Sequence, residues 1–72
     1  MEAAEEFLKQ KGIRQVRVRY HEDLARIEVS PKERKKFFDT VLMDEISNVL
    51  SKIGFKYVTL DMEGYIPGKM NR

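Results

Sequence analysis

Hydrophobic residues repeat with a helical period at the start of the chain. Between Glu2 and Lys11 the apolar side chains fall on one face of a helix, and Gly12 follows where a left-handed C-cap residue belongs. Glutamates near the start and lysines near the end of this segment complement the helix dipole. The pattern predicts an amphipathic helix with Ala3, Ala4, Phe7 and Leu8 gathered on one face.

Between Gln15 and Val29 the period changes to two, which is typical of strands. Apolar and polar residues alternate on both sides of the polar pair Glu22-Asp23. With that pair as the loop of a hairpin, the two strands share one apolar face, and the register is internally consistent. On that face Val16 opposes Val29, Val18 opposes Ile27, and Tyr20 opposes Ala25.

Two further helices are expected after the hairpin. Ser30-Pro31-Lys32-Glu33 has the pattern of a capping box with proline at the first helical position. This helix carries Phe37 and Phe38, both expected in the core, and Asp39 is the expected N-cap of a longer helix that ends at Gly54. The buried stripe of the longer helix comprises Leu42, Ile46, Val49, Leu50 and Ile53.

A third strand is predicted from Lys56 to Met62, with Val58, Leu60 and Met62 pointing inward, and residues 63–72 form an irregular tail. The order αββααβ predicts one α+β domain over residues 1–72, with a three-stranded, largely antiparallel sheet and the helices packed on one face. Such a domain resembles a ferredoxin-like split unit that lacks one strand. The segments Leu8 to Val16 and Leu50 to Val58 share one pattern: helix, capping glycine, an apolar residue, a basic residue, any residue and valine. The likeness is either an internal repeat or a convergent use of a common local pattern.

Composition narrows the classes of function. The 72 residues include no cysteine and one histidine, which excludes disulfides, thiolate nucleophiles and multi-histidine zinc sites. Apolar runs are too short to span a membrane, and we expect a cytoplasmic protein. Charged residues make up 36%, against about 25% in typical domains, yet the net charge is only +2. That balance argues against a nucleic-acid-coating protein, and the Lys/Glu content fits a thermophilic source.

The polar face of the hairpin carries the candidate chemistry. Arg17 and Arg19 are two residues apart on one strand, so both guanidinium groups point the same way, and Arg26 opposes Arg19. Parallel N–H forks suit a phosphate or carboxylate, and the opposed arginines favour a bound anion. The alternative is a solvated face on which Arg17 and Glu28 form an ordinary cross-strand ion pair.

Other candidates are weaker. His21 with Glu22 and Asp23 has the residue types of a metal site, but neighbours in a turn rarely converge on one ion, so a solvated turn is favoured. Tyr57 and Tyr65 have rings that could stack on bases, without any RNA-binding signature. Glycine-rich loops that cradle phosphates are absent from the sequence.

Two long segments of the chain resemble a known family. They are Gly12 to His21 with Asp23 to Val29, and Gly54 to Asp61 with Gly64-Tyr65 and Gly68 to Asn71. The likeness is to the C-terminal domain of the LarE family of ATP-dependent sulfur transferases, which are PP-loop ATP pyrophosphatases. It covers nearly all of this chain but only about the last quarter of a full-length family member.

The resemblance implies a phosphate site at Arg17 and Arg19, and matches Glu28 and Glu5 to carboxylates implicated in handling metal or substrate. A further acidic position of the family falls near Lys36 in this sequence, which argues against a complete metal site. Family members bind ATP through an N-terminal PP-loop domain and donate sulfur from their own cysteine. This sequence has neither a PP-loop motif nor a cysteine, so ATP and a divalent metal would belong to a fuller system.

The sequence therefore predicts an accessory, non-catalytic domain that binds the phosphate of a nucleotide-like substrate. Its expected partners are a PP-loop ATP-binding domain or chain, further copies of itself, and a phosphorylated small molecule, with neither membrane nor nucleic acid. Two alternatives stay open: a pure oligomerisation module, and a weak RNA-binding domain that uses the arginine strand and Tyr57.

Overall fold

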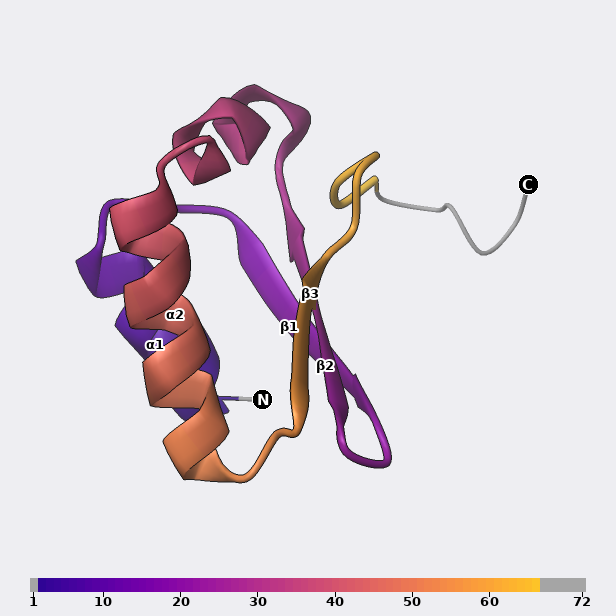
Figure 1. Ribbon diagram of the computed structural model, residues 1–72. Coiled ribbons are helices and arrows are strands. Elements are labelled where there is room, and N and C mark those ends of the chain that lie inside the picture. The colour runs from indigo at the N-terminus through magenta and orange to yellow at the C-terminus, as the bar shows by residue number, and fades with distance from the viewer. Residues whose placement is uncertain (1, 67–72) are drawn as a thin grey trace.

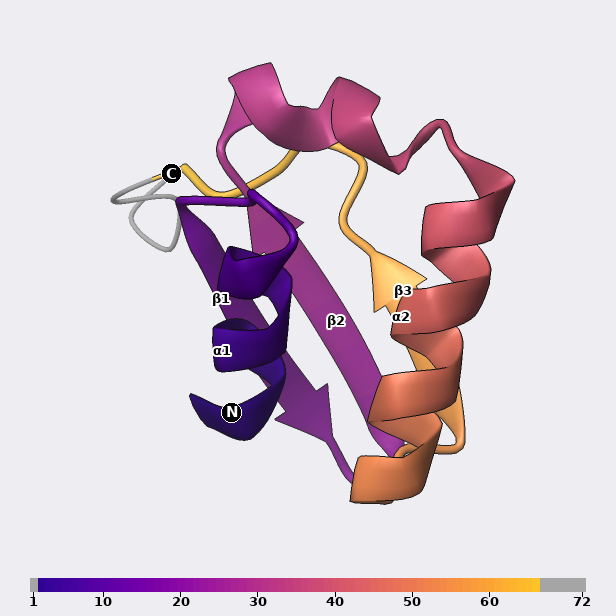
Figure 2. The same cartoon turned by 90° about the vertical axis from the view of Figure 1, so that its left-hand side faces the viewer.

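Helices lie against one face of a three-stranded sheet in the computed structural model, which describes residues 2–66 (Figure 1). A view turned by a quarter of a circle shows α1 in front of β1 and α2 beside β3 (Figure 2). The elements in chain order are α1 (Glu2–Gln10), β1 (Val16–His21), β2 (Leu24–Val29), the 3-10 helix η1 (Pro31–Phe37), α2 (Thr40–Ile53) and β3 (Tyr57–Leu60). The predicted α+β class, with helices on one face, is confirmed.

The sheet has the strand order β1-β2-β3, so β2 lies in the centre. β1 and β2 are antiparallel in the predicted register, with Val16 opposite Val29 and Arg17 opposite Glu28. β3 joins the other edge of β2 in parallel, with Tyr57 beside Leu24. Because α2 carries the chain back along the sheet before β3 begins, the third strand runs in the same direction as β2, and the sheet is mixed.

The core lies between the helices and the inner face of the sheet. Side chains from every described element meet there, and the largest of those that are fully buried are Leu8, Ile13, Val29 and Leu50. The predicted stripe on α2 is confirmed, since two of its residues are buried and the other three are partly buried against the core. The buried set is Ala4, Leu8, Ile13, Val16, Val18, Ala25, Ile27, Val29, Phe37, Ile46, Leu50 and Phe55.

Both α-helices end in the same way. After α1, Gly12 has φ of 92° and Ile13 donates its N–H to the carbonyl of Leu8 at 3.2 Å. After α2, Gly54 has φ of 131° and the next N–H, from Phe55, reaches the carbonyl of Leu50 at 3.2 Å. These paired bonds form a Schellman-type ending, in which a left-handed glycine is followed by a buried apolar residue. The matching segments of the sequence therefore encode the same helix ending.

The predicted helix after the hairpin differs in type and in its cap. It is a 3-10 helix, and Ser30 makes no side-chain capping bond. The Ser30 hydroxyl donates to the carboxylate of Glu33 at 2.9 Å, and that carboxylate is taken up by two backbone N–H groups of the segment before β1. A capping box needs the glutamate to turn back to the serine N–H, and here it is held elsewhere.

Three residues expected on the apolar side of their elements, Phe38, Met62 and Tyr20, are exposed. The backbone turns at Phe38, which caps η1, so Phe37 enters the core while Phe38 stays 86% exposed. β3 ends at Leu60, because Asp61 accepts hydrogen bonds from the next backbone N–H groups and turns the chain, leaving Met62 85% exposed. Tyr20 also remains exposed at the end of β1, where its ring lies 6.3 Å from that of Phe55.

The tail predicted to be irregular has no helix or strand over residues 63–66, and the rest of it lies outside the described residues. In the part of the chain that the structure describes, no helix combines the length and apolar character needed to cross a bilayer.

Candidate functional site

The candidate site lies on the outer face of the hairpin, away from the helices. Arg17 and Arg19 are exposed and alternate with Val16 and Val18, which are buried beneath the helices. The two arginines therefore share one face, as the alternation predicts, and the register places Arg26 opposite Arg19.

Glu28 sits between two of these arginines and binds both. Its side chain is 12% exposed, with Oε1 at 3.5 Å from Arg19 Nε and Oε2 at 2.9 Å from Arg26 Nη2. Arg26 Nε also donates to Oε2 at 3.1 Å. The repulsion between the opposed arginines, which suggested a bound anion, is thus balanced by a carboxylate of the protein itself.

Arg17 is held differently. Glu28 is its register partner, yet the ion pairs of Glu28 run diagonally across to Arg19 on β1 and along β2 to Arg26. Over residues 2–66 Arg17 makes no ion pair. Its guanidinium lies over the ring of Tyr65, 5.6 Å from the ring centre, which is within cation–π range. The hypothesis of an ordinary Arg17–Glu28 pair is therefore wrong for this structure.

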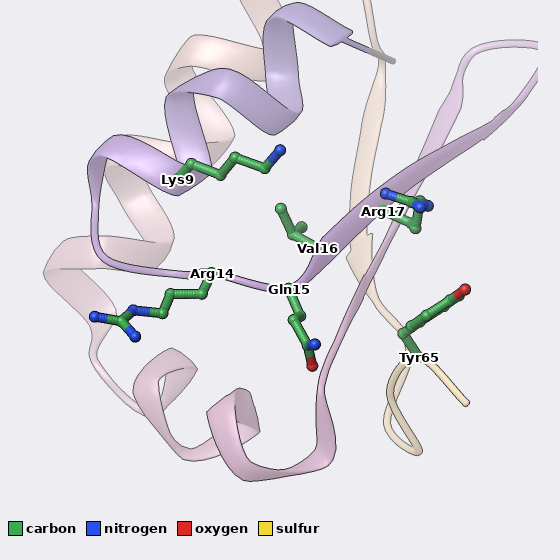
Figure 3. Close-up of a pocket in the computed structure, with 6 residues that line it drawn as sticks. All are labelled: Lys9, Arg14, Gln15, Val16, Arg17 and Tyr65. Carbon is green, nitrogen blue, oxygen red and sulfur yellow. The ribbon is translucent and has the colours of Figure 1, made fainter. Parts of the chain in front are cut away.

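A shallow hollow opens beside Arg17, at the start of β1 (Figure 3). Its volume is about 170 Å³, and it is partly open to solvent. Figure 3 shows Lys9 reaching from α1 toward Val16, while the side chain of Arg14 points away from Arg17. The lining residues are Lys9, Arg14, Gln15, Val16, Arg17 and Tyr65.

Tyr65 belongs to the segment expected to be an irregular tail, and its position was not predicted. Its N–H donates to the carbonyl of Val29 at 2.6 Å, which ties the segment to the end of β2. Gly64 has φ of 94°, and a Cβ there would lie 2.5 Å from the same carbonyl oxygen, so only glycine fits. Arg34 also stabilises the segment from Met62 to Tyr65, because its Nη1 donates to the carbonyl of Met62 at 2.8 Å.

Glu5, a candidate metal or substrate carboxylate, contacts the free edge of β1. Its Oε2 accepts the N–H of Val18 at 2.9 Å. Burial alone would raise the pKa of Glu5, but the hydrogen bond from Val18, with help from the nearby charge of Arg17, lowers the pKa below its ordinary value. The carboxylate thus stays ionised and covers a strand edge that would otherwise be exposed.

Glu33, whose role the sequence did not predict, holds the two residues that precede β1. Glu33 is 8% exposed and accepts the N–H of Arg14 at 2.7 Å and that of Gln15 at 3.1 Å. Burial by itself would raise the pKa of Glu33, but these bonds, with those from Ser30 and Lys36, lower the pKa to about 2. The sequence signal at Glu33 was the capping-box pattern with Ser30, which does not reveal the bonds to Arg14 and Gln15.

Lys36 stands near the position at which the LarE resemblance expects an acidic residue, and its side chain stabilises the fold. Its Nζ donates to the carbonyl of Gly12 at 2.7 Å and lies 3.4 Å from Glu33 Oε1. The lysine thus joins η1 to the end of α1.

The candidate metal ligands do not converge in the described part of the chain. Across the described residues, no three His, Asp or Glu side chains are grouped so that they could hold an ion. His21 is exposed beside the turn, where Glu22 has φ of 56°. Glu28 is engaged with arginines and Glu5 with a backbone N–H, so the two candidate carboxylates act on separate parts of the sheet.

Comparison with known proteins gives two relatives of note, and no protein-family model matches the chain. An uncharacterised Synechocystis protein, slr1717, is 46% identical over 69 residues, which is 96% of this chain and 26% of that protein. Pyridinium-3,5-bisthiocarboxylic acid mononucleotide synthase of Lactiplantibacillus plantarum is 46% identical over 69 residues, which is 96% of this chain and 24% of that protein.

This similarity supports membership of the LarE family. The chain spans only about a quarter of the length of these curated relatives. The LarE-like segment contains the whole hairpin with Arg17, Arg19, Arg26 and Glu28, since the match leaves out very few of its residues.

Proposed function

We propose that the chain is an accessory domain of a LarE-type sulfur-transferase system, and that it binds the phosphate of a pyridinium mononucleotide through Arg17 and Arg19. The name of the Lactiplantibacillus relative supplies the ligand class, a pyridinium mononucleotide. A phosphate monoester carries up to two negative charges and several acceptor oxygens, which suit arginine N–H groups.

The observation that carries this proposal is the state of Arg17. It is exposed on the outer face, and the carboxylate opposite to it is occupied by Arg19 and Arg26. Among the described residues Arg17 makes no ion pair, and its guanidinium is held over an aromatic ring, so its N–H groups are available to an incoming anion. Arg19 is half-exposed and keeps N–H donors free of its single ion pair with Glu28, so it can contribute as well.

The chemistry of the system is assigned to another domain or chain. This sequence contains no PP-loop motif for ATP and no cysteine to supply sulfur. We propose that it packs against an ATP-binding PP-loop unit and against further copies of itself. The exposed Phe38 and Val41, near the start of α2, are apolar contacts that such packing would cover.

A titration tests the phosphate site. Nicotinamide mononucleotide and inorganic phosphate are added separately to the full chain, and amide shifts of Arg17 and Arg19 are followed by NMR. The double variant Arg17→Ala/Arg19→Ala should lose at least about tenfold in affinity, because two charge-assisted contacts are removed. Lys52→Ala, in the last turn of α2, removes a charge elsewhere and serves as the control. Unchanged affinity in the double variant, with its fold intact by circular dichroism, would contradict the site.

RNA binding is the second candidate, because Tyr57 is 53% exposed on β3, which pairs with β2, the strand that carries Arg26. Base stacking on tyrosine combined with phosphate contacts would make binding fall steeply with salt. A single-stranded oligonucleotide that binds more tightly than the mononucleotide, and is weakened by Tyr57→Ala, would favour this candidate over the first.

A further inference from the structure

The hollow at the start of β1 has an unusual lining. Three of its six residues are cations, namely Lys9, Arg14 and Arg17, and none is acidic. The chain as a whole carries nearly equal numbers of acidic and basic residues, 12 and 14, so this imbalance is local. A concave site lined with positive charge raises the local concentration of anions.

The backbone at the hollow also offers a donor. Val18 gives its N–H to Glu5 on α1, so the N–H of Val18 points to the free edge of β1, away from β2. Alternate N–H groups of a strand point the same way, so the N–H of Val16 faces the same edge, where Val16 lines the hollow.

Backbone N–H groups on either side of Val16 already bind carboxylates of the chain. Glu33 accepts the N–H groups of Arg14 and Gln15 just before β1, and Glu5 accepts that of Val18 at the free edge. Neither glutamate is among the residues that line the hollow, where Lys9, Arg17 and the N–H of Val16 present donors.

Tyr65 fixes one wall of the hollow. Its ring lies under the guanidinium of Arg17, at 5.6 Å, and its backbone is tied to Val29 through the glycine turn at Gly64. An arginine held against an aromatic face loses less side-chain freedom when it binds an anion. Tyr65 is in this sense a positioning residue for Arg17.

We propose that this hollow holds the phosphate group of the ligand, with Lys9 and the N–H of Val16 joining Arg17. This inference rests on the proposed function for the ligand class, and adds Lys9, Val16 and Tyr65 to the site. The hollow, at about 170 Å³ and partly open to solvent, has room for a phosphate with the sugar and base outside.

The test compares single variants of the full chain in their affinity for inorganic phosphate and for nicotinamide mononucleotide. Lys9→Ala should weaken both by about fivefold or more, because a charge-assisted contact is lost. Lys11→Ala is the matched control, since Lys11 lies on the same turn of the chain but pairs with Glu45 on α2. Tyr65→Leu should weaken binding by about threefold, and Tyr65→Phe, which keeps the ring, should restore it.

The outcomes separate this inference from the proposed function. If Arg17→Ala and Arg19→Ala weaken binding while Lys9→Ala behaves like Lys11→Ala, the hollow is not the phosphate site, although the proposed function stands. If no variant changes the affinity, both the proposed function and the assignment of the hollow are wrong. A loss for the mononucleotide without one for inorganic phosphate would place Lys9 beside the sugar or ring, and would overturn the assignment. Thermal melts of each variant show that the fold is retained.

Discussion

At the scale of single residues, the outer face of the hairpin separates its three arginines into two kinds. Arg19 and Arg26 are both held by Glu28, while Arg17 rests on Tyr65. Strand alternation predicted that all three would lie on one face, because a period of two places every second side chain on the same side. It could not predict the diagonal pairing, which depends on how long side chains bend over the sheet.

Glu33 provides a prediction about pH. Its pKa falls from an ordinary 4.5 to about 2 in the folded chain, so its contribution is complete above pH 4.5 and is lost as the pH falls toward 2. At about 1.4 kcal/mol per pKa unit, the contribution is at most roughly 3 kcal/mol. Glu33→Gln should lower the free energy of unfolding by about 2 kcal/mol at pH 7, because an amide provides only one acceptor oxygen for the two N–H groups.

Urea unfolding of both proteins at several pH values measures this effect. The difference between wild type and Glu33→Gln should shrink steadily below pH 4.5 and nearly vanish near pH 2. Glu6→Gln, on an exposed position of α1, is the control and should change stability by less than about 0.5 kcal/mol. A constant difference across the whole pH range would show that the buried charge is not the source.

At the scale of elements, local signals predicted α1, α2 and the hairpin well. Each helix ends at a left-handed glycine followed by a buried apolar residue, and the hairpin register follows from the alternation alone. The type and cap of η1 were not predicted correctly. The Glu33 carboxylate, which the predicted capping box requires, accepts the N–H groups of Arg14 and Gln15 instead. These bonds are tertiary contacts, which cannot be predicted from local helix propensity.

The turn after β3 is the element that brings Tyr65 to Arg17, and Gly64 is its critical residue. Gly64→Ala would place a Cβ 2.5 Å from the carbonyl oxygen of Val29 in a left-handed conformation. We expect a loss of about 1–3 kcal/mol in unfolding free energy. We also expect the amide of Arg17 to shift in the NMR spectrum, because the turn must move and carry Tyr65 with it.

Gly12→Ala is the comparison for this variant. Gly12 also has a positive φ, yet nothing lies within 4 Å of its Cβ position, so only the backbone strain remains. Its cost should be smaller, about 1 kcal/mol, without any change at Tyr65. Equal costs and equal spectra would mean that the close approach at Val29 relaxes easily.

At the scale of the whole molecule, the sequence predicted the fold class and the side of the sheet that the helices cover. Both follow from which residues are apolar, since the inner face of each strand and one stripe of each helix must be buried together. The hollow was not predicted, because Lys9, Val16 and Tyr65 come from three separate segments. They meet because α1 packs against β1 and the turn at Gly64 is bonded to Val29 at the end of β2.

The balance of charge over the outer face gives the last prediction. Glu28 is the carboxylate that holds Arg19 and Arg26, so Glu28→Gln raises the net charge of the chain and leaves two opposed arginines without a counter-ion. Without added anion the variant should be less stable by about 0.5–1 kcal/mol. Its affinity for inorganic phosphate should rise by about two- to fivefold, because a repelling charge is removed and Arg19 is released.

Melting temperatures across a phosphate series at constant ionic strength, together with direct titration, separate this effect from general screening. Phosphate should stabilise Glu28→Gln more than wild type, since a ligand that binds the folded state stabilises it in proportion to its affinity. Glu45→Gln makes the same charge change on α2, where Glu45 pairs with Lys11, and should leave phosphate affinity near the wild-type value. If both variants gain equally, net charge alone attracts the anion. If Glu28→Gln binds more weakly than wild type, Glu28 supports the bound ligand and is not merely a counter-ion for its arginines.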